Sequence, residues 1–212
     1  VRDKILGQII VALILFNAGV KIDFITNPFG GVISLPLALS MILSVGWIMV
    51  IVNAINLIDG LDGLAAGITI ISSLSLLAIA IFRNDIGSVF IMIALIGSLS
   101  GFLRYNFHPA KIFMGDCGSM FLGFILSIIS IQGINKMAAT VSLLVPIAAL
   151  GVPIYDVVFA VLRRSIKGGG IFQPDRKHIH YRLLEIGMTH EHVVMALYFM
   201  GIYFGIISYL FV

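Results

Sequence analysis

The sequence predicts an all-α fold, a bundle of helices that crosses a membrane several times. Hydrophobic residues make up 60% of the chain and charged residues only 11%, whereas soluble domains carry about 25% charged residues. Apolar runs of about 17–25 residues, the length at which a helix crosses a bilayer, recur along the chain. Because no linker or soluble segment interrupts them, we expect residues 1–212 to form a single transmembrane domain.

The apolar runs divide the chain into about seven predicted membrane spans. They cover residues 5–19, 36–52, 64–82, 87–103, 119–134, 138–162 and 191–212. The connector 20–35 is rich in turn-forming residues and is typical of an irregular loop. Pro146 and Pro153 lie inside the sixth span. We expect them to kink that helix, which membrane helices tolerate when neighbours satisfy the freed backbone groups.

The charges of the connectors predict which side of the membrane each one faces. With alternating crossings, one set of connectors holds the N-terminus and residues 53–63, 104–118 and 163–190. Its basic residues are Arg2, Lys4, Arg104, Lys111, Arg163, Arg164, Lys167, Arg176, Lys177 and Arg182. The basic residues of the other set are Lys21, Arg83 and Lys136. Cytoplasmic loops carry an excess of Lys and Arg, so we expect the first set, which also holds nearly every polar motif, to be cytoplasmic.

One connector of this set follows a strongly apolar span and carries polar residues at intervals of three. They are Asn53, Asn56, Asp59 and Asp62. Only neighbours at this spacing share a face of an ideal helix. The intervening Gly60 and Gly63 favour a loosened backbone that lets both carboxylates converge on one target. The natural target is Mg²⁺ together with a phosphate; the alternative is a polar helix end whose acids cap the next helix.

A second cluster precedes the fifth span and is centred on Asp116. Gly115 and Gly118 flank this acid and permit close approach of the backbone. The free N–H groups at the start of a helix also attract anions. The alternatives are that Asp116 only caps the helix, and that Phe113 is an apolar anchor at the interface rather than a ring that stacks on a base.

The long connector 163–190 is a third candidate region because it attracts anions. Its basic and imidazole groups are Arg163, Arg164, Lys167, Arg176, Lys177, His178, His180 and Arg182. Plain anchoring of the positive side and lipid-headgroup binding are the alternatives, but anchoring leaves the imidazoles unexplained. Residues two apart share a face only in extended backbone. His178 and His180 can therefore act together from a loop but not from one helix.

Three other features are interpreted as structural. An acid inside a span is normally paired, so we expect Asp156 to make an ion pair or hydrogen bond rather than to act in catalysis. The glycine triplet at 168–170 is expected to be a flexible linker, and His190 and His192 are expected to be surface residues.

Carboxylates from two connectors thus face a basic, histidine-bearing loop on one side of the membrane. Metal-assisted phosphoryl transfer needs such a set, with acids for Mg²⁺ and cations for the phosphates. The sequence contains no P-loop motif, which argues against a transport ATPase. A transporter or flippase of lipid-linked anionic sugars is a further alternative, but it would place polar groups at mid-bilayer.

Three motifs carry a resemblance to a known family. They are Asn53-x-x-Asn56-x-x-Asp59-Gly-x-Asp62-Gly, Asn106-x-His-Pro109…Phe113-Met-Gly-Asp116-x-Gly-Ser119 and Lys177-His178-Ile-His180-x-Arg182-Leu. Residues 4–8 also look like a Lys-x-x-x-Gln helix of the same family. Together they resemble the polyprenyl-phosphate N-acetylhexosamine-1-phosphate transferases, a family that includes the phospho-MurNAc-pentapeptide translocase. The sequence Asn-Leu-Ile-Asp-Gly-Leu-Asp is closer to the branch that starts teichoic-acid and lipopolysaccharide O-antigen synthesis than to the translocase.

The resemblance implies a membrane-embedded transferase of cell-envelope polysaccharide synthesis. A polyprenyl (undecaprenyl) phosphate oxygen attacks the sugar-bearing phosphate of a UDP-N-acetylhexosamine, taken as UDP-GlcNAc, and UMP is released. The resemblance also implies Mg²⁺ as cofactor, with Mn²⁺ as an alternative, and a plasma-membrane enzyme with a cytoplasmic active site. No nucleic acid takes part, and a homodimer is an option for its assembly. Transfer of phospho-MurNAc-pentapeptide in peptidoglycan synthesis is the alternative reaction.

The resemblance further implies a role for each matching residue. The catalytic set is Asp59, Asp62, Asp116, His178 and His180. Within it, Asp116 resembles the Mg²⁺ ligand, Asp59 and Asp62 match acids around the metal and the uridine, and the histidines match the loop that handles the diphosphate and sugar. The substrate-binding set is Lys4 near the lipid phosphate, Asn106 and Phe113 at the uracil, Arg182 in the histidine loop, and Asn53 and Asn56.

The sequence departs from the family pattern in two places. The loop usually reads His-x-His-His, but its last position here is Tyr181, which can hydrogen-bond but cannot be a cation. The family also has an Asp-Asp motif upstream of the Lys-x-x-x-Gln helix, proposed to activate the lipid phosphate. We therefore expect residues 1–212 to be the C-terminal part of a longer enzyme and to be inactive alone.

Overall fold

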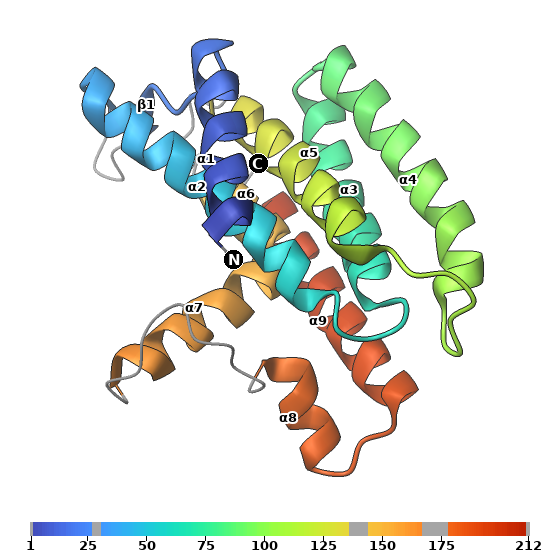
Figure 1. Cartoon of the computed structure of the whole chain (residues 1–212). Coiled ribbons are helices and arrows are strands. Elements are labelled where there is room, and N and C mark those ends of the chain that lie inside the picture. Colours follow the sequence, from blue (N-terminus) through green and yellow to red (C-terminus); the bar gives the residue numbers. More distant parts are fainter. Residues whose placement is uncertain (1, 27–30, 136–143, 167–177, 211–212) are drawn as a thin grey trace.

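The computed structural model describes residues 2–26, 31–135, 144–166 and 178–210 as a bundle of helices (Figure 1). The helices are α1 (Arg2–Asn17), α2 (Leu37–Ile58), α3 (Leu64–Phe82), α4 (Ile86–Asn106), α5 (Gly115–Asn135), α6 (Leu144–Ala149), α7 (Gly151–Ile166), α8 (Ile179–Glu185) and α9 (His190–Leu210). The strands are β1 (Phe24–Thr26) and β2 (Val32–Ser34). The prediction of a helical bundle is confirmed.

Five helices in the described part of the chain are long and apolar enough to cross a membrane. They are α2, α3, α4, α5 over Gly115–Gly133, and α9. The first predicted span forms α1, which is shorter at 16 residues. The sixth is divided between α6 and α7, while residues 138–143 of that span lie outside the described residues. Pro146 and Pro153 each lie in the first turn of one of these helices, where a missing N–H leaves no backbone acceptor unpaired.

The connector 20–35 contains a small antiparallel ribbon where the sequence predicted an irregular loop. Phe24 pairs with Ser34 and Ile25 with Ile33, and the N–H of Leu35 donates to the carbonyl of Asp23 at 2.9 Å. The two strands are only three residues each, too short for a convincing alternation of apolar and polar residues. The period-two signal of a strand is therefore missing from the sequence.

Helix α2 lies in the middle of the bundle and packs against α1, α5 and α7. Ile51 and Ile55 are completely buried on it. Gly123 of α5 allows the close approach of this pair, because a Cβ at that position would stand 2.6 Å from the Cα of Val52. Small residues at such contacts are the usual means by which membrane helices pack closely.

The connectors with the polar motifs gather at one end of the bundle. Figure 1 shows the α2–α3 connector, the α4–α5 connector and α8 at this end, away from the β1–β2 ribbon. Polar contacts join these segments across the chain: Lys4 pairs with Asp116, and Asp62 contacts both His108 and His190. Side chains that are far apart in the sequence therefore form one polar surface at the end of an apolar bundle.

Candidate active site

The connector between α2 and α3 begins where α2 loses its helical backbone. Asp59 is the C-cap residue of α2, with ψ at 47°, and Gly63 adopts a left-handed conformation with φ of 77° before α3 begins. The side chain of Asn106 accepts a hydrogen bond from the N–H of Gly63 at 3.1 Å. The hydroxyl of Tyr198 donates to the Gly63 carbonyl at 2.6 Å. Helices α4 and α9 thus hold the connector from two sides.

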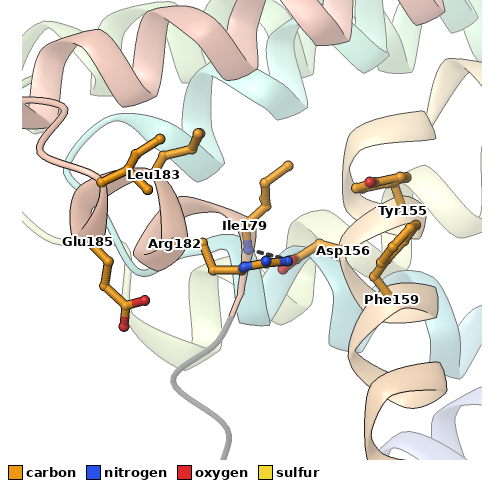
Figure 2. Close-up of a pocket in the computed structure, with 8 residues that line it drawn as sticks. Tyr155, Asp156, Phe159, Ile179, Arg182, Leu183 and Glu185 are labelled. Carbon is orange, nitrogen blue, oxygen red and sulfur yellow. Dashed lines mark hydrogen bonds between the residues drawn. The ribbon is translucent and has the colours of Figure 1, made fainter. Parts of the chain in front are cut away.

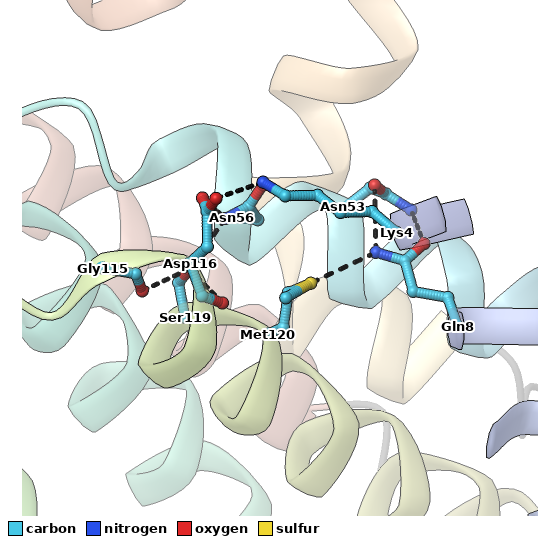
Figure 3. Close-up of polar contacts among 8 residues, drawn as sticks. All are labelled: Lys4, Gln8, Asn53, Asn56, Gly115, Asp116, Ser119 and Met120. Atoms are coloured by element: carbon cyan, nitrogen blue, oxygen red, sulfur yellow. Dashed lines mark hydrogen bonds and ion pairs between the residues drawn. The ribbon is translucent and has the colours of Figure 1, made fainter. Parts of the chain in front are cut away.

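A carboxylate in the first turn of α5 is the centre of the largest polar cluster (Figure 3). Asp116 forms an ion pair with Lys4 of α1. The amide of Asn56 on α2 donates to Asp116 Oδ1 at 3.0 Å and contacts Ser119 Oγ at 2.8 Å. An ammonium group and an amide from two other helices therefore contact one carboxylate of α5, and the amide also contacts a serine hydroxyl of α5.

Two amide side chains hold α1 against α2 beside this cluster, as Figure 3 also shows. Asn53 donates to Gln8 Oε1 at 2.8 Å, and Gln8 donates back to Asn53 Oδ1 at 3.4 Å. Lys4 and Gln8 are four residues apart on α1 and share one face of the helix. Asn53 and Asn56 do not pair with each other; each faces a different helix.

Asp59 lies next to the Asp116 cluster at the end of α2. Burial, together with the negative charge of Asp116, raises the pKa of Asp59 from 3.8 to about 6. A raised carboxylate pKa is typical of two acids that share a site. The two carboxylates supply oxygen atoms of the kind that could hold a divalent cation.

Asp62, by contrast, turns away from Asp59. Its Oδ2 atom lies 2.9 Å from His108 Nδ1 and accepts a hydrogen bond from the N–H of Ala110 at 3.1 Å. These contacts hold the pKa of Asp62 below its usual range against the opposing effect of burial. The expectation that both carboxylates converge on one target is wrong, because the left-handed Gly63 and its anchor on Asn106 direct them to different neighbours.

His190 also differs from its prediction as a surface residue. It is half-buried, and its ring stacks on that of His108 with centroids 4.2 Å apart and planes 20° from parallel. Its Nε2–H donates to the carbonyl of Asp62 at 3.2 Å. His192, in contrast, is exposed as expected. No local pattern separates the two histidines, since both open an apolar helix after Thr189.

Asp156 on α7 makes the structural hydrogen bonds that were expected of an acid inside a predicted span. Its Oδ2 lies 2.8 Å from Nδ1 of His178, and its Oδ1 accepts the N–H of Ile179 at 2.8 Å. Both side chains are 5% exposed. Because a carboxylate only accepts, Nδ1 of His178 carries a proton and donates it to Asp156. The acid thus orients a histidine of the predicted catalytic set.

His180 is completely buried in the first turn of α8, and neither of its ring nitrogens has a hydrogen-bond partner within the described residues. Burial lowers the pKa of His180 from 6.5 to about 4, so the ring is neutral at pH 7. A Cβ at position 60 would stand 2.6 Å from its Nε2, so the ring packs against Gly60. His180 therefore packs against Gly60 and carries no positive charge, although the sequence placed it among the anion-attracting groups.

His178 and His180 lie in the arrangement that their spacing required, with only one of them inside a helix. His178 has an extended backbone with ψ of 156° and precedes α8. The two rings lie nearly parallel, with centroids 5.9 Å apart. Two residues at i and i+2 can place their rings side by side here because His178 lies outside α8, whereas His180 lies inside it.

A pocket of ≈380 Å³ opens beside the Asp156–His178 pair, between α7 and α8 (Figure 2). Tyr155 and Phe159 line one side, and Arg182 and Glu185 line the other. Figure 2 shows the guanidinium of Arg182 extended toward Asp156. The pocket thus combines aromatic walls with an exposed cation.

Two predicted uracil-site residues have different surroundings. Asn106 is 5% exposed and uses both ends of its amide on the backbone, accepting from Gly63 and donating to the Ile112 carbonyl at 2.9 Å. Phe113 is 77% exposed and lies at an apolar groove between α4 and α5. In this structure Asn106 shapes the site, and only Phe113 is accessible for stacking.

Part of the predicted basic loop lies outside the described residues. This applies to the side chains of Arg163 and Arg164 and to residues 167–177, which include the glycine triplet, Arg176 and Lys177.

Comparison with known proteins gives consistent matches. The sequence matches glycosyl transferase family 4 over residues 1–134. It is 43% identical over 211 residues to a probable undecaprenyl-phosphate N-acetylglucosaminyl 1-phosphate transferase of Bacillus subtilis strain 168, covering 97% of this chain and 57% of that protein. It is 39% identical over 227 residues to a decaprenyl-phosphate N-acetylglucosaminephosphotransferase of Mycobacterium tuberculosis H37Rv, covering 97% and 55%.

A more distant relative is a phospho-N-acetylmuramoyl-pentapeptide-transferase of Desulforudis audaxviator. It is 31% identical over 222 residues, covering 98% of this chain and 64% of that protein. The chain therefore spans little more than half the length of the curated relatives it matches.

Proposed function

The chain belongs to glycosyl transferase family 4, and from this membership we propose that it carries the site of a GlcNAc-1-phosphate transfer. In this reaction a polyprenyl phosphate takes the sugar phosphate from UDP-GlcNAc, and UMP is released. The relatives at 43% and 39% identity are named for such transfers. The observation that carries the proposal is the Lys4–Asp116–Asn56 constellation at the end of an apolar bundle. At this end of the bundle, the phosphate of a membrane lipid lies within reach of both Asp116 and Lys4.

The residues around Asp116 fit a hard divalent cation such as Mg²⁺, which prefers oxygen ligands. Asp59 and Asp116 supply carboxylates, and Asn56 and Ser119 supply neutral oxygens nearby. The raised pKa of Asp59, caused by burial and by Asp116, is what two acids show when too little positive charge lies between them. We assign Asp116 and Asp59 as the groups that hold Mg²⁺. When bound, the ion neutralises charge on the transferring phosphoryl group.

Lys4 is the residue we assign to the polyprenyl phosphate. Its ammonium group faces Asp116, and the Gln8–Asn53 pair holds α1 in place beside it. The attacking oxygen of the lipid phosphate forms a bond to the sugar-bearing phosphorus, and the bond from that phosphorus to the UMP oxygen breaks. Lys4 orients the attacking group and offsets its charge.

His178 and Arg182 are assigned to the diphosphate of the nucleotide sugar. Arg182 is exposed at the α7–α8 pocket, and its planar guanidinium suits phosphate oxygens. Asp156 fixes the orientation of His178 and the nitrogen that carries its proton. His180 packs against Gly60 and thereby links α8 to the connector that carries Asp59 and Asp62.

We also propose that the motif end of the bundle faces the cytoplasm and that the chain is a multi-pass plasma-membrane protein. Arg104 in the last turn of α4, Lys111 and Arg182 lie at this end, whereas Arg83 follows α3 at the other. This distribution agrees with the excess of basic residues on cytoplasmic loops.

The proposal is tested by UMP release from UDP-GlcNAc in membranes that contain the chain and undecaprenyl phosphate. We expect Mg²⁺-dependent release that Asp116→Asn lowers at least about 100-fold, since it removes a charged group from the transition-state environment. Asp23→Asn, at an acid that directly precedes β1, is the matched control and keeps wild-type activity. The assay is run on the chain alone and on the chain joined to the Asp-Asp segment of another family member. UMP release in neither form, or full activity of Asp116→Asn, contradicts the proposal.

Transfer of phospho-MurNAc-pentapeptide is the second candidate, favoured by the relative at 31% identity. The same membranes are therefore assayed with UDP-MurNAc-pentapeptide. We expect the smaller nucleotide sugar to be used, because the relatives at higher identity are named for N-acetylglucosamine transfer.

A further inference from the structure

Helix α9 contacts the α2–α3 connector at two successive backbone carbonyls. Nε2 of His190 lies 3.2 Å from the carbonyl oxygen of Asp62. About two turns further along α9, the hydroxyl of Tyr198 donates to the carbonyl of Gly63 at 2.6 Å. His190 also stacks on His108, so several contacts fix its ring. Among the described residues, the Gly63 carbonyl is the only hydrogen-bond partner of the Tyr198 hydroxyl.

The carbonyl that Tyr198 contacts lies at the start of α3. It also accepts the N–H of Gly67 at 2.9 Å, the first backbone hydrogen bond of that helix. The N–H of Gly63 donates to the side chain of Asn106, so both polar groups of this residue are held from outside the connector. Glycine has little backbone preference of its own, and the short connector contains Gly60 as well as Gly63. Its path is therefore set by these contacts rather than by its own sequence.

The first turn of α3 leaves room for the tyrosine ring at Gly67. A Cβ at this position would collide with the ring and the hydroxyl of Tyr198. A glycine inside a helix is less favourable than an alanine, and the space that the ring needs explains its presence here. Tyr198 also lines an apolar pocket of ≈240 Å³ together with Leu103 and Phe199. In such surroundings a hydroxyl without a partner is costly, so the bond to Gly63 fixes the ring and the carbonyl together.

We propose that Tyr198 is a positioning residue for the sugar-phosphate transfer. Through the Gly63 carbonyl it holds the connector that carries Asp59 in place beside Asp116. This inference rests on the proposed function, in which these two acids hold Mg²⁺. Because Mg²⁺ demands near-ideal geometry of its ligands, a small displacement of one carboxylate weakens binding of the ion more than it disturbs the fold.

Tyr198→Phe removes the hydroxyl and keeps the ring. We expect the Mg²⁺ concentration for half-maximal UMP release to rise about 2–10-fold, the effect of one neutral hydrogen bond, and excess Mg²⁺ to restore most of the wild-type rate. A role in stability alone would leave the Mg²⁺ requirement unchanged. Tyr203→Phe, the same substitution at a tyrosine of α9 that is 63% exposed, is the matched control and keeps the wild-type requirement.

Gly67→Ala breaks the same hydrogen bond by a different route. The added methyl group displaces the ring of Tyr198, so the hydroxyl leaves the Gly63 carbonyl although it is still present. We expect the same direction of change in the Mg²⁺ requirement. In a Tyr198→Ala background the ring is absent, and adding Gly67→Ala should then have no further effect. Additive effects of the two substitutions would show that they act independently and would overturn the proposed route.

Hydrogen exchange of the purified chain in detergent, read by mass spectrometry, tests the same contact without any activity. Peptides that cover residues 59–67 should exchange faster in Tyr198→Phe than in wild type or Tyr203→Phe, whereas peptides from the middle of α2 should not differ. Equal exchange over residues 59–67, or an unchanged Mg²⁺ requirement, would overturn the proposal. If the wild type releases no UMP, the transferase proposal fails, and exchange alone still decides whether Tyr198 holds the connector.

Discussion

Among the residues that the structure describes, two aspartate–histidine pairs have nearly the same contact distance and very different surroundings. Asp156 and His178 lie 2.8 Å apart with both side chains 5% exposed. Asp62 and His108 lie 2.9 Å apart with side chains 23% and 41% exposed. The first pair joins α7 to the start of α8, and the second joins two connectors at the surface.

This difference in burial decides what each pair can do. A buried carboxylate must have donors on its oxygens, because an unsatisfied charge away from water is costly. Asp156 has two donors, His178 and the N–H of Ile179, and it therefore holds the histidine in one orientation. At the exposed pair water can replace either partner, so a hydrogen bond contributes only about 0.5–1.5 kcal/mol. The exposed pair therefore orients its histidine less strictly than the buried pair does.

The largest expected effect comes from Asp156→Asn at the buried pair. The amide can still accept from one donor, but its NH₂ group then faces the second donor, so His178 loses its fixed orientation. We expect kcat/KM for UMP release to fall about 10²–10³-fold, the range for the loss of one group that stabilises developing charge. Steady-state kinetics on folded protein, with the pH profile of kcat/KM, provide the measurement.

Asp62→Asn is the matched substitution at the exposed pair. It removes the same charge, but water can hydrogen-bond to the N–H of Ala110, so the unfolding temperature should change little. Asp156→Asn should lower it clearly, because it leaves a buried donor unsatisfied at about 1–3 kcal/mol. Asp156→Glu restores the carboxylate and should recover part of kcat/KM. Equal losses of stability at the two pairs would show that burial does not distinguish them.

The sequence was sufficient for the parts of the molecule that local patterns determine. Apolar runs of membrane length predicted the helices, and the spacing of Lys4 and Gln8 placed both on one face of α1. The position of Asp116 at a helix start follows from its flanking glycines. Asp156 was expected to be hydrogen-bonded, since an acid among apolar residues requires a partner. Each of these conclusions depends on a single continuous segment of the chain.

The remaining features depend on contacts between distant segments. Asp59 and Asp62 diverge because Asn106 of α4 and Tyr198 of α9 hold Gly63, and no local signal connects these residues. His190 and His192 look alike in sequence, but only His190 meets a second ring. The partner of Asp156 lies beyond a long connector, so its identity was not available from spacing. The division of the sixth span follows two prolines whose effect, a kink or a break, depends on packing.

The second expected effect is on the stability of the protein at acidic pH. It comes from His180, which lies beside the buried Asp156–His178 pair. Burial lowers its pKa to about 4, against 6.5 for the ordinary group. Between these values the unfolded chain binds more protons than the folded chain, so stability rises with pH. Neutral His180 therefore contributes about 3 kcal/mol to the free energy of unfolding. This contribution is fully present above pH 6.5 and is lost as the pH falls toward 4.

His180→Met tests this contribution. Neither ring nitrogen has a partner within the described residues, so an apolar side chain of similar size should be tolerated near pH 7. We expect the variant to lose much less stability than wild type between pH 6.5 and 4. The thermal unfolding midpoint across this range is the measurement, with the exposed His192→Met as control. Parallel curves for wild type and His180→Met would show that His180 is accessible to protons in the folded chain.

The smallest expected effect is the change in unfolding temperature caused by His190→Ala at the exposed pair. His190→Ala removes the ring that stacks on His108 and the hydrogen bond to the Asp62 carbonyl. Stacked rings contribute about 0.5–1.5 kcal/mol, so a modest decrease in the unfolding temperature is expected. His192→Ala should change stability by less than about 0.5 kcal/mol, as surface substitutions usually do, because Thr189 Oγ1 still accepts the N–H of residue 192. Equal unfolding temperatures for the two variants would show that neither the stack nor the hydrogen bond of His190 contributes to stability.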